Sequence, residues 1–196
     1  MPGILTNFNR VLRRAVFGDR LERMKTLLFL LLGPALACAQ QDPLEGLWQG
    51  FDGEWGHVSR QLVALAEAIP AATYSWRPGP GVRSTSEVLM HIAIANFGLL
   101  HFTGPKLPDG LTAPNLEKTV TGKAEVVNWL KRSLEAVRTA RANLPRGDLE
   151  RRIKVEGRDA TVDGVYLRII VHANEHMGQL VAYARVNGIA PPWSGH

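Results

Sequence analysis

The sequence predicts an all-α fold, a four-helix bundle, and three observations lead to this prediction. Four segments repeat apolar residues with the 3.6-residue period of a helix. Each is bounded by capping or helix-breaking residues, and no alternating strand series or phosphate-binding loop interrupts them. The 196-residue chain has a globular composition, with 45% hydrophobic and 21% charged residues. Four long helices in a chain of this size can bury their apolar faces against one another in a bundle.

The first predicted helix spans residues 54–69 and follows a polar, glycine-rich linker at 40–53. Its apolar residues fall on one stripe that would face the core, and Pro70 ends it. That stripe consists of Val58, Leu62, Leu65 and Ile69. The segment after Pro70 carries aromatic, proline and glycine residues, so we expect an ordered loop there.

The second predicted helix is the most apolar of the four. Ser84 and Glu87 have the spacing of a capping box at its start. Residues 88–102 are apolar almost all round, which is typical of a buried central helix. Within this helix, Ala95 and Gly98 are small enough for a neighbouring helix to approach closely.

A long connection at residues 103–121, rich in proline and glycine, precedes the third predicted helix. Its length means that the third helix need not be the antiparallel neighbour of the second. The third helix spans residues 123–144, and its inward face consists of Val126, Val127, Leu130, Leu134 and Val137. Residues 148–159 are charged and irregular, and we expect a short helical turn followed by a loop.

The last predicted helix follows Thr161, which can cap it, and ends at Gly188 before a pair of prolines. Polar and apolar residues share the face that should look into the bundle. That face consists of Val165, Ile169, His172, His176, Gln179, Leu180 and Tyr183.

Two histidines on this face suggest a metal site. His172 and His176 are one helical turn apart, and imidazoles with this spacing converge on a single point. A buried imidazole needs a partner for its ring nitrogens, which a metal ion provides. His91 lies on the most apolar helix and completes the set if the two helices face each other. Three neutral nitrogens with open positions suit a divalent transition metal, nickel or zinc first.

Each histidine alone also has a structural explanation, as a core histidine with a satisfied hydrogen bond. The presence of all three on apolar helix faces favours metal ligands, namely His91, His172 and His176. Gln179 and Tyr183 share the face and are candidates for hydrogen bonds to the ligands or for substrate contacts. Glu175 projects about 60° from His172 around the helix, and it is the candidate catalytic base or a group that orients an imidazole.

Residues 172–176 also match H-x-x-E-H, the pattern of inverted zinc peptidases. Those enzymes need a third ligand well downstream and a fold that contains a sheet, whereas only 20 residues follow His176. A metallopeptidase is therefore not indicated.

Residues 1–39 are predicted to be a signal or targeting segment. An unbroken apolar run at 27–32 follows Lys25, a Gly-Pro pair breaks it, and the small residues at 35–39 suit signal cleavage. The run is too short to span a membrane comfortably. We therefore expect an exported protein, periplasmic or secreted, with a buried or membrane-anchoring helix as the alternative. Met24 is an alternative start to Met1.

Cys38, the only cysteine, lies within this segment. Cleavage after Ala39 would remove it, whereas lipoprotein processing would make it the lipid-modified first residue. In both cases the predicted domain at 54–196 has no disulfide and cannot bind a metal through cysteine. Membrane association is expected only through the N-terminal segment or through such a lipid anchor.

The net charge of +5 does not indicate a nucleic-acid-binding protein. Six of the 23 basic residues and only two of the 18 acidic residues lie at 1–39, which leaves 17 basic and 16 acidic residues for the rest. The predicted domain is thus close to neutral and has no long basic stripe. We expect no nucleic-acid partner.

Three segments resemble the DinB superfamily. They occur in family order within about residues 50–193 and read YSWRPGPGVRS, VLMHIAIAN and HANEHMGQLVAYARVNGIAPP. The resemblance implies an up-down-down-up bundle with its long connection between the second and third helices. It also implies that the family's metal-binding histidines correspond to His91, His172 and His176. Some relatives, the bacillithiol and mycothiol transferases, use the metal to activate a low-molecular-weight thiol.

The leading hypothesis is an exported metal-dependent hydrolase or thiol S-transferase that acts on a small molecule, with the metal activating water or a thiol. The alternative is a non-catalytic metal-binding or small-ligand-binding module, monomeric or homodimeric, in which the ion is structural. A solvent-accessible metal position favours the first hypothesis, and a closed coordination sphere favours the second.

Overall fold

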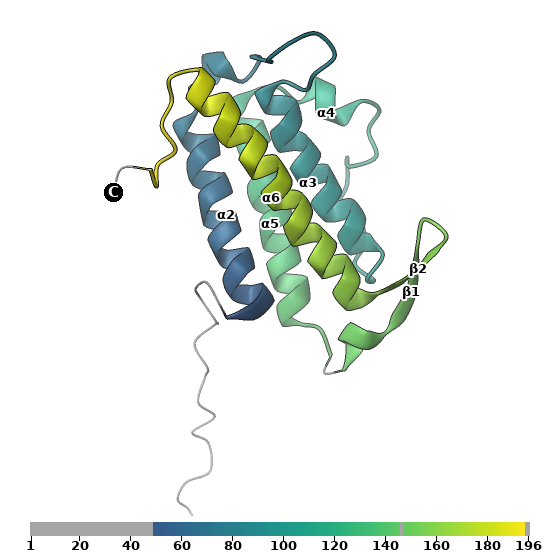
Figure 1. Cartoon of the computed structure of the whole chain (residues 1–196). Coiled ribbons are helices and arrows are strands. Elements are labelled where there is room, and N and C mark those ends of the chain that lie inside the picture. Colours follow the sequence, from purple (N-terminus) through teal and green to yellow (C-terminus); the bar gives the residue numbers. More distant parts are fainter. Residues whose placement is uncertain (1–48, 146, 195–196) are drawn as a thin grey trace, which may run out of the picture. The chain divides into compact units, whose positions relative to one another are not determined.

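The computed structural model describes residues 49–145 and 147–194, which form four long helices and a small hairpin (Figure 1). The helices are α2 (Gly50–Ala68), α3 (Thr85–His101), α5 (Lys123–Ala142) and α6 (Val162–Val186). The predicted targeting segment at 1–39, with Cys38, and the linker up to residue 48 lie outside the described residues. In the described part of the chain, no helix is both long and apolar enough to span a membrane.

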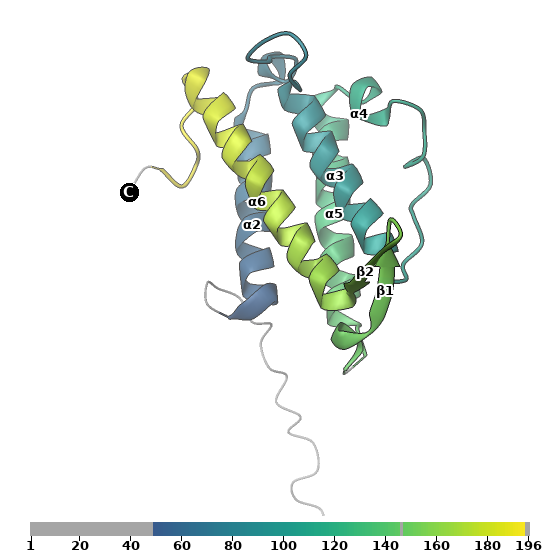
Figure 2. The ribbon, with the colours of Figure 1, turned by 45° about the vertical axis from the view of Figure 1, so that its right-hand side comes forward.

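The four helices form a ring in which each packs against two others. α3 contacts α5 and α6, and α2 contacts the same two helices. α2 and α6 run in one direction while α3 and α5 run in the other, as Figures 1 and 2 show. The predicted all-α bundle and its up-down-down-up topology are therefore confirmed. In this arrangement α3 and α6 are antiparallel neighbours, so histidines from both can meet.

α2 begins at Gly50, four residues before its predicted start, so the predicted linker at 40–53 extends too far. The reason is Phe51, whose ring stacks on Trp55 with centroids 5.9 Å apart and meets Tyr166 edge-on at 5.3 Å. This aromatic contact packs the first turn against α6, although the residues around Phe51 are polar or glycine. The predicted inward stripe of α2 is buried.

The capping box at the start of α3 is confirmed. The Glu87 backbone N–H donates to Ser84 Oγ at 3.3 Å, and the Ser84 N–H donates to Glu87 Oε2 at 2.7 Å. The predicted close approach of a helix at Gly98 is wrong, because a Cβ added there would meet no atom within 4 Å. Gly98 therefore borders open space and not a neighbouring helix.

The connection after α3 contains a one-turn helix, α4 (Leu116–Thr119), which packs against α3. Leu116 anchors this turn in the core. The anchored turn holds the residue that follows, Glu117, close to α3. The long connection was predicted, but its folding back onto α3 was not.

Residues 152–161 form a hairpin and not the predicted loop. β1 (Arg152–Val155) pairs antiparallel with β2 (Arg158–Thr161) after a 3-10 turn at Asp148–Glu150 that matches the predicted helical turn. Glu156 and Gly157, with φ of 49° and 80°, form the two-residue turn. Four-residue strands with only two large apolar side chains are too short for periodicity to reveal.

The ends of α6 confirm the predicted signals. Thr161 Oγ accepts from the Gly164 N–H at 3.1 Å, which caps the start. Gly188 follows the end with a φ of 73°, a conformation that glycine adopts without strain. The 25-residue helix spans the whole bundle and presents two histidines to α3.

Candidate metal centre

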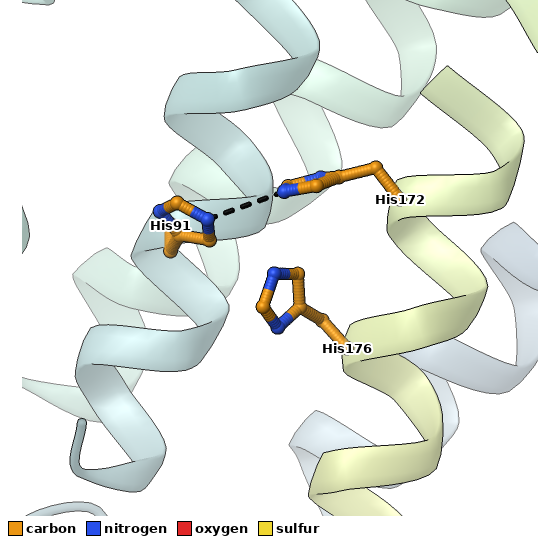
Figure 3. Close-up of side chains that lie close together, drawn as sticks. All are labelled: His91, His172 and His176. Carbon is orange, nitrogen blue, oxygen red and sulfur yellow. Dashed lines mark hydrogen bonds between the residues drawn. The ribbon is translucent and has the colours of Figure 1, made fainter. Parts of the chain in front are cut away.

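Three imidazoles meet between α3 and α6 (Figure 3). His91 comes from α3, and His172 and His176 come from adjacent turns of α6. One ring nitrogen from each lies within 4.8 Å of the others. The prediction that these three histidines converge is confirmed, and the cluster could bind a metal ion.

The spacing of two of the three nitrogens suits a single ion. The Nε2 atoms of His91 and His172 are 3.2 Å apart. Two nitrogen ligands at 2.0–2.1 Å from a tetrahedral ion are about 3.3 Å apart, so these two rings already have the separation that a metal requires. The third ring, that of His176, has its centroid 4.8 Å from that of His91 and 4.5 Å from that of His172.

A carboxylate fixes the tautomer of His91. Its Nδ1 lies 3.1 Å from Glu117 Oε2, and a carboxylate accepts hydrogen bonds but does not donate them. The hydrogen of the neutral ring is therefore on Nδ1, and Nε2 carries a lone pair. Arg83 Nε donates to the other oxygen of Glu117 at 2.6 Å and so holds the carboxylate in place.

A chain of three hydrogen bonds fixes the tautomer of His176. It ends at the backbone carbonyl of Arg83, which can only accept, so Tyr183 Oη donates to it at 3.1 Å. The Tyr183 hydroxyl then accepts from Gln179 Nε2 at 2.8 Å, which turns Gln179 Oε1 towards His176 Nδ1 at 2.9 Å. His176 must donate through Nδ1, and its Nε2 carries a lone pair.

His172 is held by burial. It is 8% exposed, and no hydrogen-bond partner for its Nδ1 lies among the described residues. Its Nε2 faces His91, as the dashed line in Figure 3 shows. Packing between the helices therefore orients this ring and directs Nε2 into the cluster.

The surroundings keep two of the rings neutral. Burial is the main cause that lowers the pKa of His172 to about 4, and His176 and His91 contribute to the shift. Burial, followed by the positive charge of Arg83, also lowers the pKa of His91. Near pH 7 these rings therefore keep the lone pairs that a metal needs.

Glu175, the candidate catalytic base, lies on the exposed side of α6. Its two carboxylate oxygens accept from the guanidinium of Arg168 at 3.2 Å each. These bonds lower the pKa of Glu175, which makes its carboxylate a weaker base. The catalytic role of Glu175 stays a prediction.

Sequence reasoning missed Glu117 and Arg83. Glu117 belongs to a short turn within a connection, and Arg83 lies just before the α3 cap, so neither falls on a periodic helix face. Arg83 serves both hydrogen-bond chains, through its side chain to Glu117 and through its carbonyl to Tyr183. No sequence pattern indicates that one residue supports two ligands from different helices.

Two hollows adjoin the cluster. A polar hollow of about 550 Å³ is lined by Arg83, Glu117 and Gln179, on the Nδ1 side of His91 and His176. A mainly apolar hollow of about 500 Å³ is lined by His172. We call the second one the α3–α6 pocket, and it is bordered by Ile94, Gly98, Leu99, Leu107, Arg168 and His172, among others.

The comparison with protein families agrees with this geometry. The model of the DinB superfamily matches residues 54–180, which contain all three histidines, Glu117 and Gln179. The chain belongs to the DinB superfamily. The resemblance drawn from its sequence segments is thereby confirmed.

A solved structure of a DinB-like protein has the same fold. The crystal structure of a DinB-like protein from Bacillus cereus ATCC 10987 superposes on the present chain with a TM-score of 0.63 at 21% sequence identity. The match covers 74% of this chain and 95% of the Bacillus protein. No curated protein matches the chain.

Proposed function

We propose that this DinB-superfamily chain is a metal-dependent enzyme, a hydrolase or a thiol S-transferase, whose His91, His172 and His176 bind nickel or zinc. One observation carries the proposal. The hydrogen-bond chains behind His91 and His176 place both ring hydrogens on the outer Nδ1 atoms, so both Nε2 lone pairs remain for an ion. An ion satisfies both lone pairs at once, whereas without an ion the His91 lone pair has only His172 Nε2, 3.2 Å away, as a donor among the described residues.

The protein residues around the cluster suit this role. Glu117 places a negative charge behind His91, which strengthens the imidazole as a ligand, and Arg83 keeps that carboxylate oriented. A divalent transition metal bound here lowers the pKa of a water or thiol that binds to it and so supplies a nucleophile near neutral pH.

The number of ligands favours an enzyme over a structural ion. Structural zinc sites have four protein ligands, whereas catalytic sites have three and an open position. In the described ranges, the cluster has three members, all histidine. The side chain of His91 is also 25% exposed, so a small molecule can reach the cluster.

We further propose that the enzyme works outside the cytoplasm, since residues 1–39 have the order of charged, apolar and small residues of a signal segment. Fusion of these residues to a reporter that is active only after export tests this. Reporter activity that survives deletion of the run at 27–32 would contradict export by this segment.

Cobalt(II) loading tests the proposed open position. The full chain is loaded with cobalt, and its visible and near-ultraviolet spectra are recorded while 2-mercaptoethanol is added. We expect d–d bands in the loaded protein and a new sulfur-to-cobalt charge-transfer band on addition of thiol, because a thiol can occupy the open position. The His172→Ala variant should show neither.

The same spectra distinguish the alternative of a structural ion. A closed site would show d–d bands that do not change with thiol, and the protein would unfold when a chelator removes the ion. Either result would contradict a catalytic centre. An open site justifies assays of ester hydrolysis and of thiol transfer, with His172→Ala as the inactive control.

A further inference from the structure

The α3–α6 pocket reaches the histidine cluster from one side. Its volume of about 500 Å³ lies in the range of small-molecule sites. Its walls come from α3, from the connection after α3, from the hairpin turn and from α6. His172 is itself part of the wall, so a molecule in this pocket contacts the cluster.

The pocket is open because α3 has small side chains where it borders the space. Ala95 and Gly98 both line it, and a Cβ added to Gly98 would meet no atom within 4 Å. Small residues at a helix interface usually let the backbones approach to close-packed contact. Here the space remains, and Ile94, Leu99 and Leu107 give it apolar walls.

The charged residues at the pocket offer little to an ionised ligand. Arg168 is already bonded to the Glu175 carboxylate through two nitrogens at 3.2 Å each. Glu156, at the hairpin turn, adds a charge of the opposite sign. An uncharged apolar group should therefore bind here more favourably than an ionised one. It gains free energy from burial and does not have to compete with Glu175 for the Arg168 guanidinium.

We propose that the α3–α6 pocket binds an uncharged apolar part of the substrate, such as an acyl chain, while the substrate's reacting group lies at the three histidines. This inference rests on the proposed metal centre and specifies its substrate class. Gly98 is seven residues beyond His91 on α3, about 10 Å along the helix, so the apolar group extends from the cluster towards the hairpin.

A series of straight-chain hydroxamates, from acetohydroxamate to octanohydroxamate, tests the proposal. The hydroxamate group binds a divalent metal, and the chain length alone changes. Affinities are measured by calorimetry on the zinc-loaded full chain and on two variants. Gly98→Leu fills the pocket, and Gly178→Leu makes the same change at an exposed site on α6 where an added Cβ also meets nothing within 4 Å.

For the parent chain and Gly178→Leu, we expect the affinity to rise about fourfold for each added methylene until the pocket is filled. In Gly98→Leu the affinity should stay flat with chain length, while acetohydroxamate should bind all three proteins within about a factor of two, since it does not reach the pocket. An equal gain with chain length in Gly98→Leu would overturn the proposal.

A measurement without metal separates this proposal from the metal centre. On addition of 1-hexanol to the metal-free protein, the amide NMR signals of Gly98 and Leu99 should shift, and that of Gly178 should not. Failure of acetohydroxamate to bind any of the three proteins would overturn the metal centre and the inference that rests on it. Normal acetohydroxamate binding without any chain-length gain and without a hexanol shift would overturn the pocket alone.

Discussion

The two interfaces that α3 makes, with α5 and with α6, handle polar groups in opposite ways. Between α3 and α5, Asn96 Nδ2 donates to Ser133 Oγ at 3.1 Å, and Ser133 Oγ donates to the Leu130 carbonyl at 2.8 Å. That chain ends on a backbone carbonyl inside the interface. Between α3 and α6, the chains from His91 and His176 lead away from the interface and leave nitrogen lone pairs within it.

The difference separates a structural polar contact from a candidate binding site. The Asn96–Ser133 chain is completed by acceptors within the protein, although Asn96 Oδ1 itself has no partner among the described residues. The Phe97 and Trp129 rings pack near this chain, with their centroids 6.2 Å apart. The histidine cluster instead leaves the Nε2 lone pairs of His91 and His176 within the interface. A cation can satisfy both, whereas a hydrogen on His172 Nε2, 3.2 Å from His91 Nε2, satisfies that of His91. The gathering of three possible ligand atoms at one point, and not a single unpaired acceptor, therefore indicates where a cation can bind.

Phe97→Ala should have the largest effect on stability, because it removes a buried ring from the α3–α5 interface. We expect the free energy of unfolding, measured by urea denaturation, to fall by about 3–5 kcal/mol. Below the onset of unfolding, metal affinity should stay within about threefold of the parent value, since distant sites usually act independently. A much larger loss of metal affinity would mean that the two interfaces are not separate.

Glu117→Gln should weaken metal binding at the α3–α6 interface. It keeps an amide oxygen near His91 Nδ1 but removes the charge and the ion pair with Arg83. We expect metal affinity to fall about 10- to 100-fold, as is usual for groups that orient a ligand. Glu135→Gln, which makes the same change at an exposed ion pair on α5, is the control and should leave the affinity unchanged. Equal metal affinities for the two variants would contradict a role of Glu117 in orienting His91.

The smallest effect on stability is expected from the capping box that starts α3, the helix that both interfaces share. Burial alone would raise the pKa of Glu87, but the Ser84 N–H and Arg77 outweigh it and lower the pKa. Glu87→Gln can keep the hydrogen bond of the box but removes the charge that pairs with Arg77 and lies at the helix N-terminus, so it should cost about 1 kcal/mol near pH 7. Because the carboxylate is favoured in the folded state, its contribution is complete above the unfolded pKa of 4.5 and is lost as the pH falls through the lower folded value.

The check is urea denaturation of the parent and Glu87→Gln between pH 7 and pH 3. The difference in unfolding free energy should shrink as the pH falls below about 4.5. Ser84→Ala removes a neutral hydrogen bond of the same box. The unfolding free energy that it costs should therefore be the same at every pH in this range. A Glu87→Gln difference that grows on acidification would contradict the sign of this pKa shift.

Much of the fold and the three histidines could be predicted from the sequence, because they depend on periodicity and caps. His172 and His176 share a helix face by spacing alone, and Ser84 with Glu87 marks the start of α3. Glu117 and Gly98 could not be placed, since their roles depend on how a connection folds back and on where a helix pair leaves space. Neither property is periodic along the chain.

Direct measurement of metal binding tests the central claim, that three lone pairs converge on one ion. The full chain and the His91→Ala, His172→Ala and His176→Ala variants are purified, and nickel and zinc content is measured together with urea denaturation. We expect close to one metal per parent chain, less than a tenth of that in each variant, and variants that remain folded without metal. A parent chain that takes up no metal under saturating nickel or zinc, or variants that bind as well as the parent, would contradict the claim.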